Sequence, residues 1–287
     1  MPPADRVVTP ALLKDWALPE VADGQDKHAR GTALVVGGSV STPGAVLLTG
    51  LAALRVGAGK LQILTVEATA VALAVAVPEA AVVGLAAEPG GSVSPDAADT
   101  VVERAEGAGV VVLGPGLMDK DAAVALLEGV LPRLGDTAVV LDGLALTALA
   151  GRPELLAGRQ AVLTPNAGEL AALLDGEEQD GPEAALAVAR RYGAAVSSPG
   201  WVADPDGGTW CVEAGGIGLG TSGSGDVLAG LVGGAVARGG EPAQAAAWGQ
   251  YLHCAAGDLL TARLGRVGFL ARELLDEVPT VLRQLRP

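Results

Sequence analysis

Apolar runs alternate along the chain with alanine-rich stretches of helical length, and glycine or proline stands at most of the changeovers. Short continuous apolar runs are typical of parallel strands that are buried on both faces. The clearest predicted strands are 33–36, 61–66, 110–113, 138–141 and 161–163. The predicted helices between them are 44–56, 95–105, 122–134 and 168–174. This alternation predicts an α/β fold with a mostly parallel central sheet and helices on both of its faces.

Three further regions complete the predicted order of elements. The apolar stretch 68–85 is interrupted by Pro78 and Glu79, so it is too short for a membrane span and predicts a buried helix followed by a buried strand. Region 194–212 carries Asp-Gly-Gly at 206–208 between two β-prone runs, which predicts a hairpin appended to the sheet edge. The closing helices are predicted at 225–238, 242–264 and 270–285.

The pattern predicts a single domain over residues 27–287, because no linker-like segment interrupts it. Residues 1–26 read as an N-terminal arm. This arm contains Pro2, Pro3, Pro10 and Pro19. One interpretation is that it wraps on a neighbouring subunit.

Composition and charge narrow the class of protein. Half of the residues are hydrophobic and 18% are charged, which favours a packed core over disorder. The formal net charge of −14 argues against nucleic acid and anionic membranes as partners. Cys211 and Cys254 lie far apart and predict neither a metal site nor a disulfide framework. Charged residues and proline at the N-terminus leave no apolar signal-peptide core, so we expect a cytoplasmic protein.

Candidate chemistry is expected where the predicted strands end, because open α/β sheets bind ligands beyond the carboxyl ends of their strands. Glycine-rich or polar segments follow five positions of this kind. They are Gly37-Gly38-Ser39 with Pro43-Gly44-Ala45, Gly114-Pro115-Gly116, Asp142-Gly143, Thr164 to Glu169, and Gly220 to Asp226.

The last of these segments is the sharpest signal. A glycine-rich turn that runs directly into a helix places free N–H groups and the positive helix end around one point, which predicts an anion site. Asp226 stands beside that point, and a carboxylate there is suited to accept a proton from a substrate hydroxyl. The alternative is that Asp226 only caps the helix and favours its dipole.

The other candidates are less specific. Thr164-Pro165-Asn166 indicates either a polar side chain in the cleft or an ordinary helix start. His253 lies in an alanine-rich helix and is interpreted as a packed or hydrogen-bonded residue. With His28 as the only other histidine, we expect neither a zinc site nor a Ser-His-Asp triad and predict no dedicated metal ligands. A nucleotide-bound Mg²⁺ needs no such cage.

Taken together, these motifs resemble the ADP-dependent NAD(P)H-hydrate dehydratases, a branch of the ribokinase-like superfamily. The resemblance covers nearly the whole chain. It rests on Leu34 to Ser39, Pro43-Gly44-Ala45, Ala53 to Gly59, Pro78-Glu79, Gly114-Pro115-Gly116, Leu163-Thr164-Pro165 with Gly168-Glu169, and Gly223 to Gly230. It implies a three-layer α/β/α fold, a cytoplasmic homo-oligomer such as a tetramer, ADP or ATP as phosphoryl donor, and Mg²⁺.

The resemblance also implies a reaction and a set of roles. The ring hydroxyl of (S)-NAD(P)H hydrate is phosphorylated, and phosphate then leaves to restore NAD(P)H. Asp226 would activate the hydroxyl and contact the substrate. Gly223, Ser224 and Gly225 would hold the transferred phosphoryl group. Substrate-lining positions would be Ala45, Gly116 and Asn166.

Several positions depart from the family pattern. The family usually has His at Asn166, a second Asp at Leu144 and Thr at Ser224. At Pro199-Gly200 the family's Lys-Gly step is missing, which removes a cationic contact to the nucleotide phosphates. Lys60 is expected at the amino end of its strand, opposite the cleft. Two alternatives therefore stay open, a ribokinase-like kinase of small alcohols and a non-catalytic nucleotide-binding paralogue.

Overall fold

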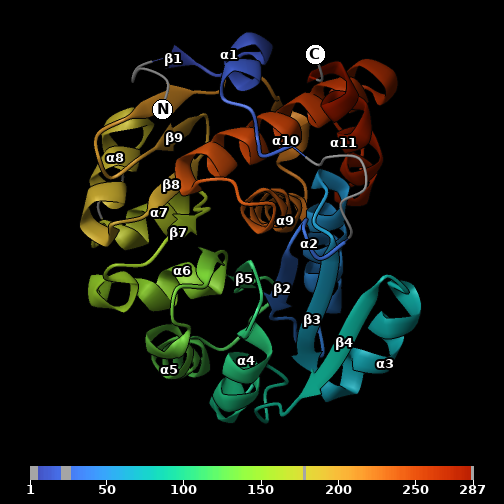
Figure 1. Cartoon of the computed structure of the whole chain (residues 1–287), viewed down its shortest axis with the longest axis vertical. Coiled ribbons are helices and arrows are strands. Elements are labelled where there is room, and N and C mark those ends of the chain that lie inside the picture. The colour runs from blue at the N-terminus through green and yellow to red at the C-terminus, as the bar shows by residue number, and fades with distance from the viewer. Residues whose placement is uncertain (1–5, 21–26, 177–178, 286–287) are drawn as a thin grey trace.

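A computed structural model describes residues 6–20, 27–176 and 179–285 (Figure 1). Its ten strands form one sheet in the order β1-β10-β9-β8-β7-β6-β5-β2-β3-β4. The strands are β1 Arg6–Val7, β2 Thr32–Val36, β3 Lys60–Val66, β4 Ala80–Leu85, β5 Val110–Leu113, β6 Ala138–Leu141, β7 Ala161–Leu163, β8 Ala195–Ser198, β9 Trp201–Ala203 and β10 Thr209–Cys211. From β8 to β4 neighbouring strands run parallel, whereas β9 is antiparallel to both of its neighbours.

The helices lie on both faces of this sheet. They are α1 Pro10–Asp15, α2 Pro43–Val56, α3 Glu67–Ala76, α4 Ala98–Ala105, α5 Lys120–Val130, α6 Leu144–Leu149, α7 Ala167–Leu173, α8 Gly181–Tyr192, α9 Ser224–Ala237, α10 Pro242–Leu264 and α11 Ala271–Leu285. Successive side chains of a strand point to opposite faces. Accordingly, Val35 packs in the core beneath α2, α9, α10 and α11, while Leu34 and Val36 pack in the core beneath α4 to α8. The three-layer α/β/α prediction is confirmed.

Helix α9 lies unusually close to α2. A side chain at Gly230 would meet the Thr49 carbonyl oxygen, and one at Gly234 would meet the Ala53 carbonyl oxygen at 2.5 Å. The small residues on this face therefore set the distance between the two helices. Their contact fixes the first turn of α9 beside the first turns of α2, which is where the site is assembled.

The sheet edge at β4 differs from the sequence prediction. Helix α3 and strand β4 form as predicted over 68–85, but they are only partly buried. Val71 and Val75 are more than three-quarters exposed, and most of β4 is partly exposed. The reason is position, because β4 is the terminal strand of the sheet and α3 packs mainly against it (Figure 1). Apolar content alone does not distinguish an edge strand from a central one.

The other edge of the sheet contains one strand, β1, that was not predicted. Strands β8 to β10 form the expected antiparallel extension, and β1 then pairs with β10 outside it. Residues 6–20 of the predicted arm thus pack on their own chain, where the Trp16 and Trp210 rings lie 5.2 Å apart. Residues 1–5 and 21–26 lie outside the described residues, so the boundary at residue 26 stays a prediction.

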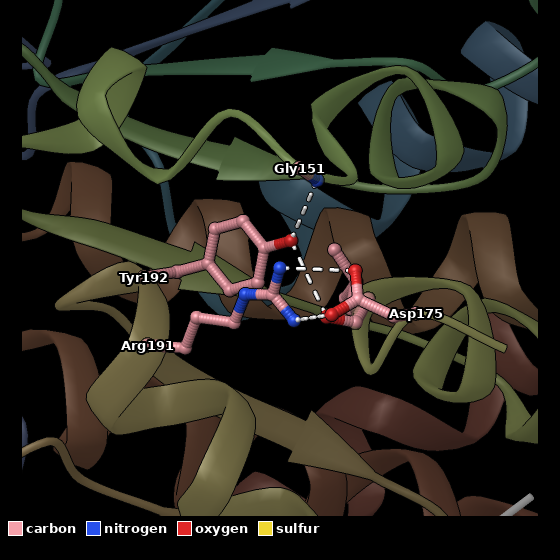
Figure 2. A network of polar contacts seen from close by, with 5 residues as sticks. Gly151, Asp175, Arg191 and Tyr192 are labelled. Atoms are coloured by element: carbon pink, nitrogen blue, oxygen red, sulfur yellow. Dashed lines mark hydrogen bonds and ion pairs between the residues drawn. The ribbon is translucent and has the colours of Figure 1, made fainter. Parts of the chain in front are cut away.

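Helix α8 was not predicted from the sequence. It is connected by side-chain contacts to α7, the helix that begins at the predicted site residue Asn166. Figure 2 shows how its last turn is joined to the end of α7. The Arg191 guanidinium binds both carboxylate oxygens of Asp175, at 2.7 and 3.0 Å. The buried Tyr192 hydroxyl accepts a hydrogen bond from the Gly151 N–H and donates one to the Leu173 carbonyl. These contacts hold α7 in place between α6 and α8. No described helix is long and apolar enough to cross a membrane.

Candidate active site

The predicted site segments come together at the carboxyl edge of the parallel strands. The loop after β2 contacts the loop after β5, where the Gly38 N–H donates to the Pro115 carbonyl at 2.7 Å. The Thr42 hydroxyl donates to the Gly116 carbonyl at 2.8 Å. A side chain at Gly116 would approach the Ala45 methyl group to 2.8 Å. The two predicted substrate-lining positions, Ala45 and Gly116, are therefore neighbours with little side-chain volume between them.

Thr49 links this pair to the first turn of α9. Its hydroxyl lies 3.0 Å from the Ala45 carbonyl oxygen and 3.0 Å from the Asp226 carbonyl oxygen. Thr49 is fully buried. This contact holds the main chain of the predicted base Asp226 beside Ala45, one of the predicted substrate positions.

The first turn of α9 begins with a glycine instead of a capping side chain. Gly223 occupies the N-cap with a φ of 89°, a conformation that favours glycine, and no side chain caps the helix. The Ser224 N–H donates to the Thr221 carbonyl at 3.2 Å. Among the described residues, the Gly223, Gly225 and Asp226 N–H groups have no such acceptor. A Cβ at Gly225 would meet nothing within 4 Å, so this turn borders open space. The arrangement is suited to bind an anion.

The Asp226 carboxylate lies at the edge of this turn. One of its oxygens is 3.9 Å from the position that a Cβ of Gly223 would occupy. Burial raises the pKa of Asp226 from 3.8 to about 6. A general base is most effective when its pKa lies near the working pH, so this carboxylate is suited to accept a proton near neutral pH.

Asp142 adds a second buried carboxyl group at the end of β6. Burial, with smaller contributions from the nearby Asp226 and Glu169 carboxylates, raises its pKa to about 7. Its Oδ1 lies 2.7 Å from the Thr164 hydroxyl, which also lies 3.2 Å from the Leu141 carbonyl. The single hydroxyl hydrogen of Thr164 cannot serve both oxygens. A protonated Asp142 that donates to Thr164 satisfies both contacts, in agreement with its raised pKa.

Residues 33–280 match the family model described as NAD(P)H-hydrate dehydratase. The chain is 44% identical, over 99% of its length and 98% of the relative, to the ADP-dependent (S)-NAD(P)H-hydrate dehydratase of Xanthomonas campestris pv. campestris. The chain belongs to the NAD(P)H-hydrate dehydratase family.

Solved structures agree with this membership. The ADP/ATP-dependent NAD(P)H-hydrate dehydratase from Bacillus subtilis, co-crystallised with ATP and Mg²⁺, superposes with a TM-score of 0.82 at 28% identity and covers 98% of this chain and 99% of its own. A ribokinase-like superfamily protein from Enterococcus faecalis also gives a TM-score of 0.82, at 23% identity, with 98% of this chain and 96% of its own covered. That second likeness concerns the fold, which is the ribokinase-like fold predicted from the motifs.

Asn166, where the family pattern predicts His, begins α7 with a complete capping box. Its Oδ1 accepts the Glu169 N–H at 3.0 Å, and the Glu169 carboxylate accepts the Asn166 N–H at 2.9 Å. The Asn166 side chain is exposed, and its amide nitrogen is not used by the cap. The helix-start interpretation of this residue is therefore confirmed, and its role toward a substrate stays a prediction.

The two positions that concern cationic contacts lie as expected. Pro199 occupies the turn between β8 and β9, so the lysine of the family's Lys-Gly step is absent from that turn. Lys60 begins β3 at the opposite end of the sheet, where its ammonium lies 2.8 Å from Nδ1 of His28. Two surface pockets of about 600 and 400 Å³ lie near β10 and at the amino ends of β7 and β8, and none of the predicted site residues lines them.

One contact of the site was not anticipated from the sequence. His253 is buried and hydrogen-bonded, as predicted, but its partner is Ser224 in the first turn of α9, with Nε2 2.8 Å from Oγ. The signal available in the sequence was weak, since a histidine in an alanine-rich helix does not reveal which neighbouring helix it faces.

Proposed function

We propose that the protein repairs hydrated nicotinamide cofactors by ADP-dependent dehydration of (S)-NAD(P)H hydrate to NAD(P)H. The observation that carries this proposal is the buried Thr49 hydroxyl. It lies 3.0 Å from the carbonyl oxygens of both Ala45 and Asp226, and so holds the uncapped first turn of α9 beside the predicted substrate position at Ala45. Membership of the NAD(P)H-hydrate dehydratase family supports the same reaction.

In the first step the substrate hydroxyl becomes a nucleophile. Asp226 accepts the hydroxyl proton, and the oxygen forms a bond to the terminal phosphorus of ADP while the bond to the leaving AMP breaks. The Gly223 and Gly225 amides and the Ser224 hydroxyl hold the phosphoryl oxygens. The positive end of α9 stabilises their charge, so the protein contributes positioning and electrostatics to this step.

In the second step the phosphorylated hydrate loses phosphate together with a ring proton, which restores the double bond of NAD(P)H. Phosphorylation makes this elimination easier because phosphate leaves more readily than hydroxide. Ala45 and Gly116 are the residues that we propose to contact the nicotinamide ring. The free amide nitrogen of Asn166 supplies a hydrogen-bond donor to the substrate.

Mg²⁺ fits this site only as an ion carried by the nucleotide. No group of three metal-ligating side chains gathers among the residues that the structure describes. Asp226 is the acidic side chain in the first turn of α9, and Mg²⁺ is often held by one or two carboxylates with phosphate oxygens and water. When bound there, the ion would supply positive charge next to the phosphates.

Pro199 bears on the choice of nucleotide. Without a lysine in this turn, the phosphates of ADP or ATP are held mainly by the α9 amides and the ion. We further propose that the protein acts in the cytoplasm as a homo-oligomer, such as a tetramer, with no nucleic acid or membrane partner.

Incubation of the protein with NADH hydrate, Mg²⁺ and either ADP or ATP tests the function. Repair is expected to restore the absorbance of reduced nicotinamide and to release one phosphate per NADH formed. A stable phosphorylated product without NADH would identify a kinase of small alcohols instead. Nucleotide binding without any product would identify a non-catalytic paralogue.

A further inference from the structure

The contact between Ser224 and His253 joins two different helices at the phosphoryl end of the site. Ser224 is the first residue of α9 and His253 lies in the middle of α10. Both residues are more than nine-tenths buried. The Ser224 N–H is held by Thr221, so the backbone and the side chain of this serine are both fixed from outside α9.

The direction of this hydrogen bond decides what the serine can do. A serine hydroxyl has one hydrogen. If that hydrogen points to His253, none is left for a phosphoryl oxygen. If His253 instead carries its hydrogen on Nε2 and donates it, the hydroxyl hydrogen of Ser224 is free to point at the anion.

Two observations favour the second arrangement. Burial lowers the pKa of His253 to about 4, so the imidazole is neutral near pH 7 and carries only one N–H. The contact with the Ser224 hydroxyl is made by Nε2, at 2.8 Å, and among the described residues it is the one hydrogen bond of the ring nitrogens. The single N–H of the neutral ring therefore has an acceptor when it lies on Nε2.

We propose that His253 is a positioning residue, whose Nε2–H donates to the Ser224 hydroxyl and thereby directs the hydroxyl hydrogen toward the transferring phosphoryl group. This role rests on the proposed function, because it assumes that a phosphoryl group occupies the turn. His253 itself does not touch the reacting atoms. As a neutral donor, it orders Ser224 without adding a charge that would hold the product phosphate.

The tautomer can be measured without any substrate. The chain has only two histidines, so ¹⁵N resonances of the imidazoles are assigned by comparison with the His28→Gln variant. The expected spectrum of His253 at pH 7 is that of a neutral ring protonated at Nε2. A ring protonated at Nδ1 would overturn the proposal. This readout stays valid even if the protein fails to repair NADH hydrate, so the two failures are distinguishable.

Kinetics test the consequence for catalysis. His253→Gln places an amide N–H near the position of Nε2 and is expected to retain most of kcat, whereas His253→Leu is expected to lose about five- to tenfold. The KM for ADP is expected to stay within about twofold, because the hydroxyl contact strengthens in the transition state. In a Ser224→Ala background, His253→Leu is expected to cause no further loss.

A matched control separates positioning from stability. Gln250 is also buried in α10, but it bonds Ser197 and Ser198 at the end of β8. Gln250→Leu is expected to lower the melting temperature, with an effect on kcat that is the same with and without Ser224→Ala. If His253→Leu behaves like this control, or changes only the melting temperature, His253 has a structural role and the proposal is wrong.

Discussion

Helices α7 and α9 both begin at the carboxyl edge of the sheet, yet their first turns are built in opposite ways. In α7, Asn166 and Glu169 satisfy each other's backbone N–H groups through their side chains. In α9, Gly223 has a φ of 89° and no side chain caps the helix. The α7 turn thus closes on itself, whereas the α9 turn leaves amides for a ligand.

This difference indicates where an anion binds. A capping side chain competes with a ligand for the same backbone N–H groups. A fully capped turn therefore has few N–H donors available for an anion. Both turns also carry an acidic residue, Glu169 in α7 and Asp226 in α9. Burial raises the pKa of each. Only Asp226 stands beside uncapped amides, which makes it the candidate base.

The largest expected effect is on turnover at the α9 turn. Asp226→Asn removes the proton acceptor while keeping the size of the side chain and its backbone N–H. General base catalysis contributes roughly 10²- to 10⁴-fold, so kcat is expected to fall by about that factor. ADP affinity, measured by calorimetry, is expected to change little. Glu169→Gln at the capped turn serves as the control and is expected to retain most of kcat. Undiminished turnover in Asp226→Asn would exclude Asp226 as the base.

The next effect concerns Asp142, which lies between the two turns and responds to both acidic residues. With a folded pKa of about 7, Asp142 keeps a proton that the unfolded chain loses near pH 4. The free energy of unfolding therefore decreases as the pH rises between these values. Asp142→Asn removes the contribution of this group to the pH dependence. The free energy of unfolding of the variant, relative to that of the wild type, is therefore expected to be about 3 kcal/mol higher at pH 8 than at pH 5. Urea unfolding at both pH values measures the gain.

The same experiment sharpens the comparison of the turns. The Asp226 carboxylate raises the pKa of Asp142 more than Glu169 does. Asp226→Asn is therefore expected to flatten the pH dependence of unfolding more than Glu169→Gln. Equal effects of the two variants would place Asp142 midway between the turns and not with the α9 site.

A smaller effect is expected from the glycine that shapes the open turn. Gly223→Ala forces a side chain into a left-handed conformation, where its Cβ would lie 2.7 Å from a methyl group of Leu48. We expect a loss of about 1 to 3 kcal/mol in stability together with weaker ADP binding. Gly168→Ala in α7 is the matched control, because its Cβ would meet only the Asn166 side chain at 3.4 Å. Equal ADP affinity in both variants would contradict an anion site at α9.

The sequence was sufficient to predict the parallel strands and the α9 turn, because both depend on local patterns. Apolar runs gave β5, β6 and β7 with the boundaries that the structure has. Burial was predicted less well, since α3 and β4 are apolar but lie at the sheet edge. The contact between Ser224 and His253 could not be predicted from the sequence either. The two residues are 29 positions apart and belong to different helices. Such contacts depend on helix packing, which periodicity does not specify.

The smallest effect is expected at Asn166, for which two roles are proposed. One is to cap α7, and the other is to donate a hydrogen bond to the substrate. Asn166→Ala removes the cap and is expected to cost about 1 kcal/mol of stability, whereas Asn166→Ser keeps a capping oxygen and is expected to be nearly neutral. Both variants lack the amide N–H donor. If that donor binds the substrate, both raise the KM for NADH hydrate by a few-fold and leave the KM for ADP unchanged. If only Asn166→Ala differs from the wild type, and in stability alone, the α7 turn is a structural cap and the hydrate contacts lie entirely at the Ala45 and Gly116 side of the site.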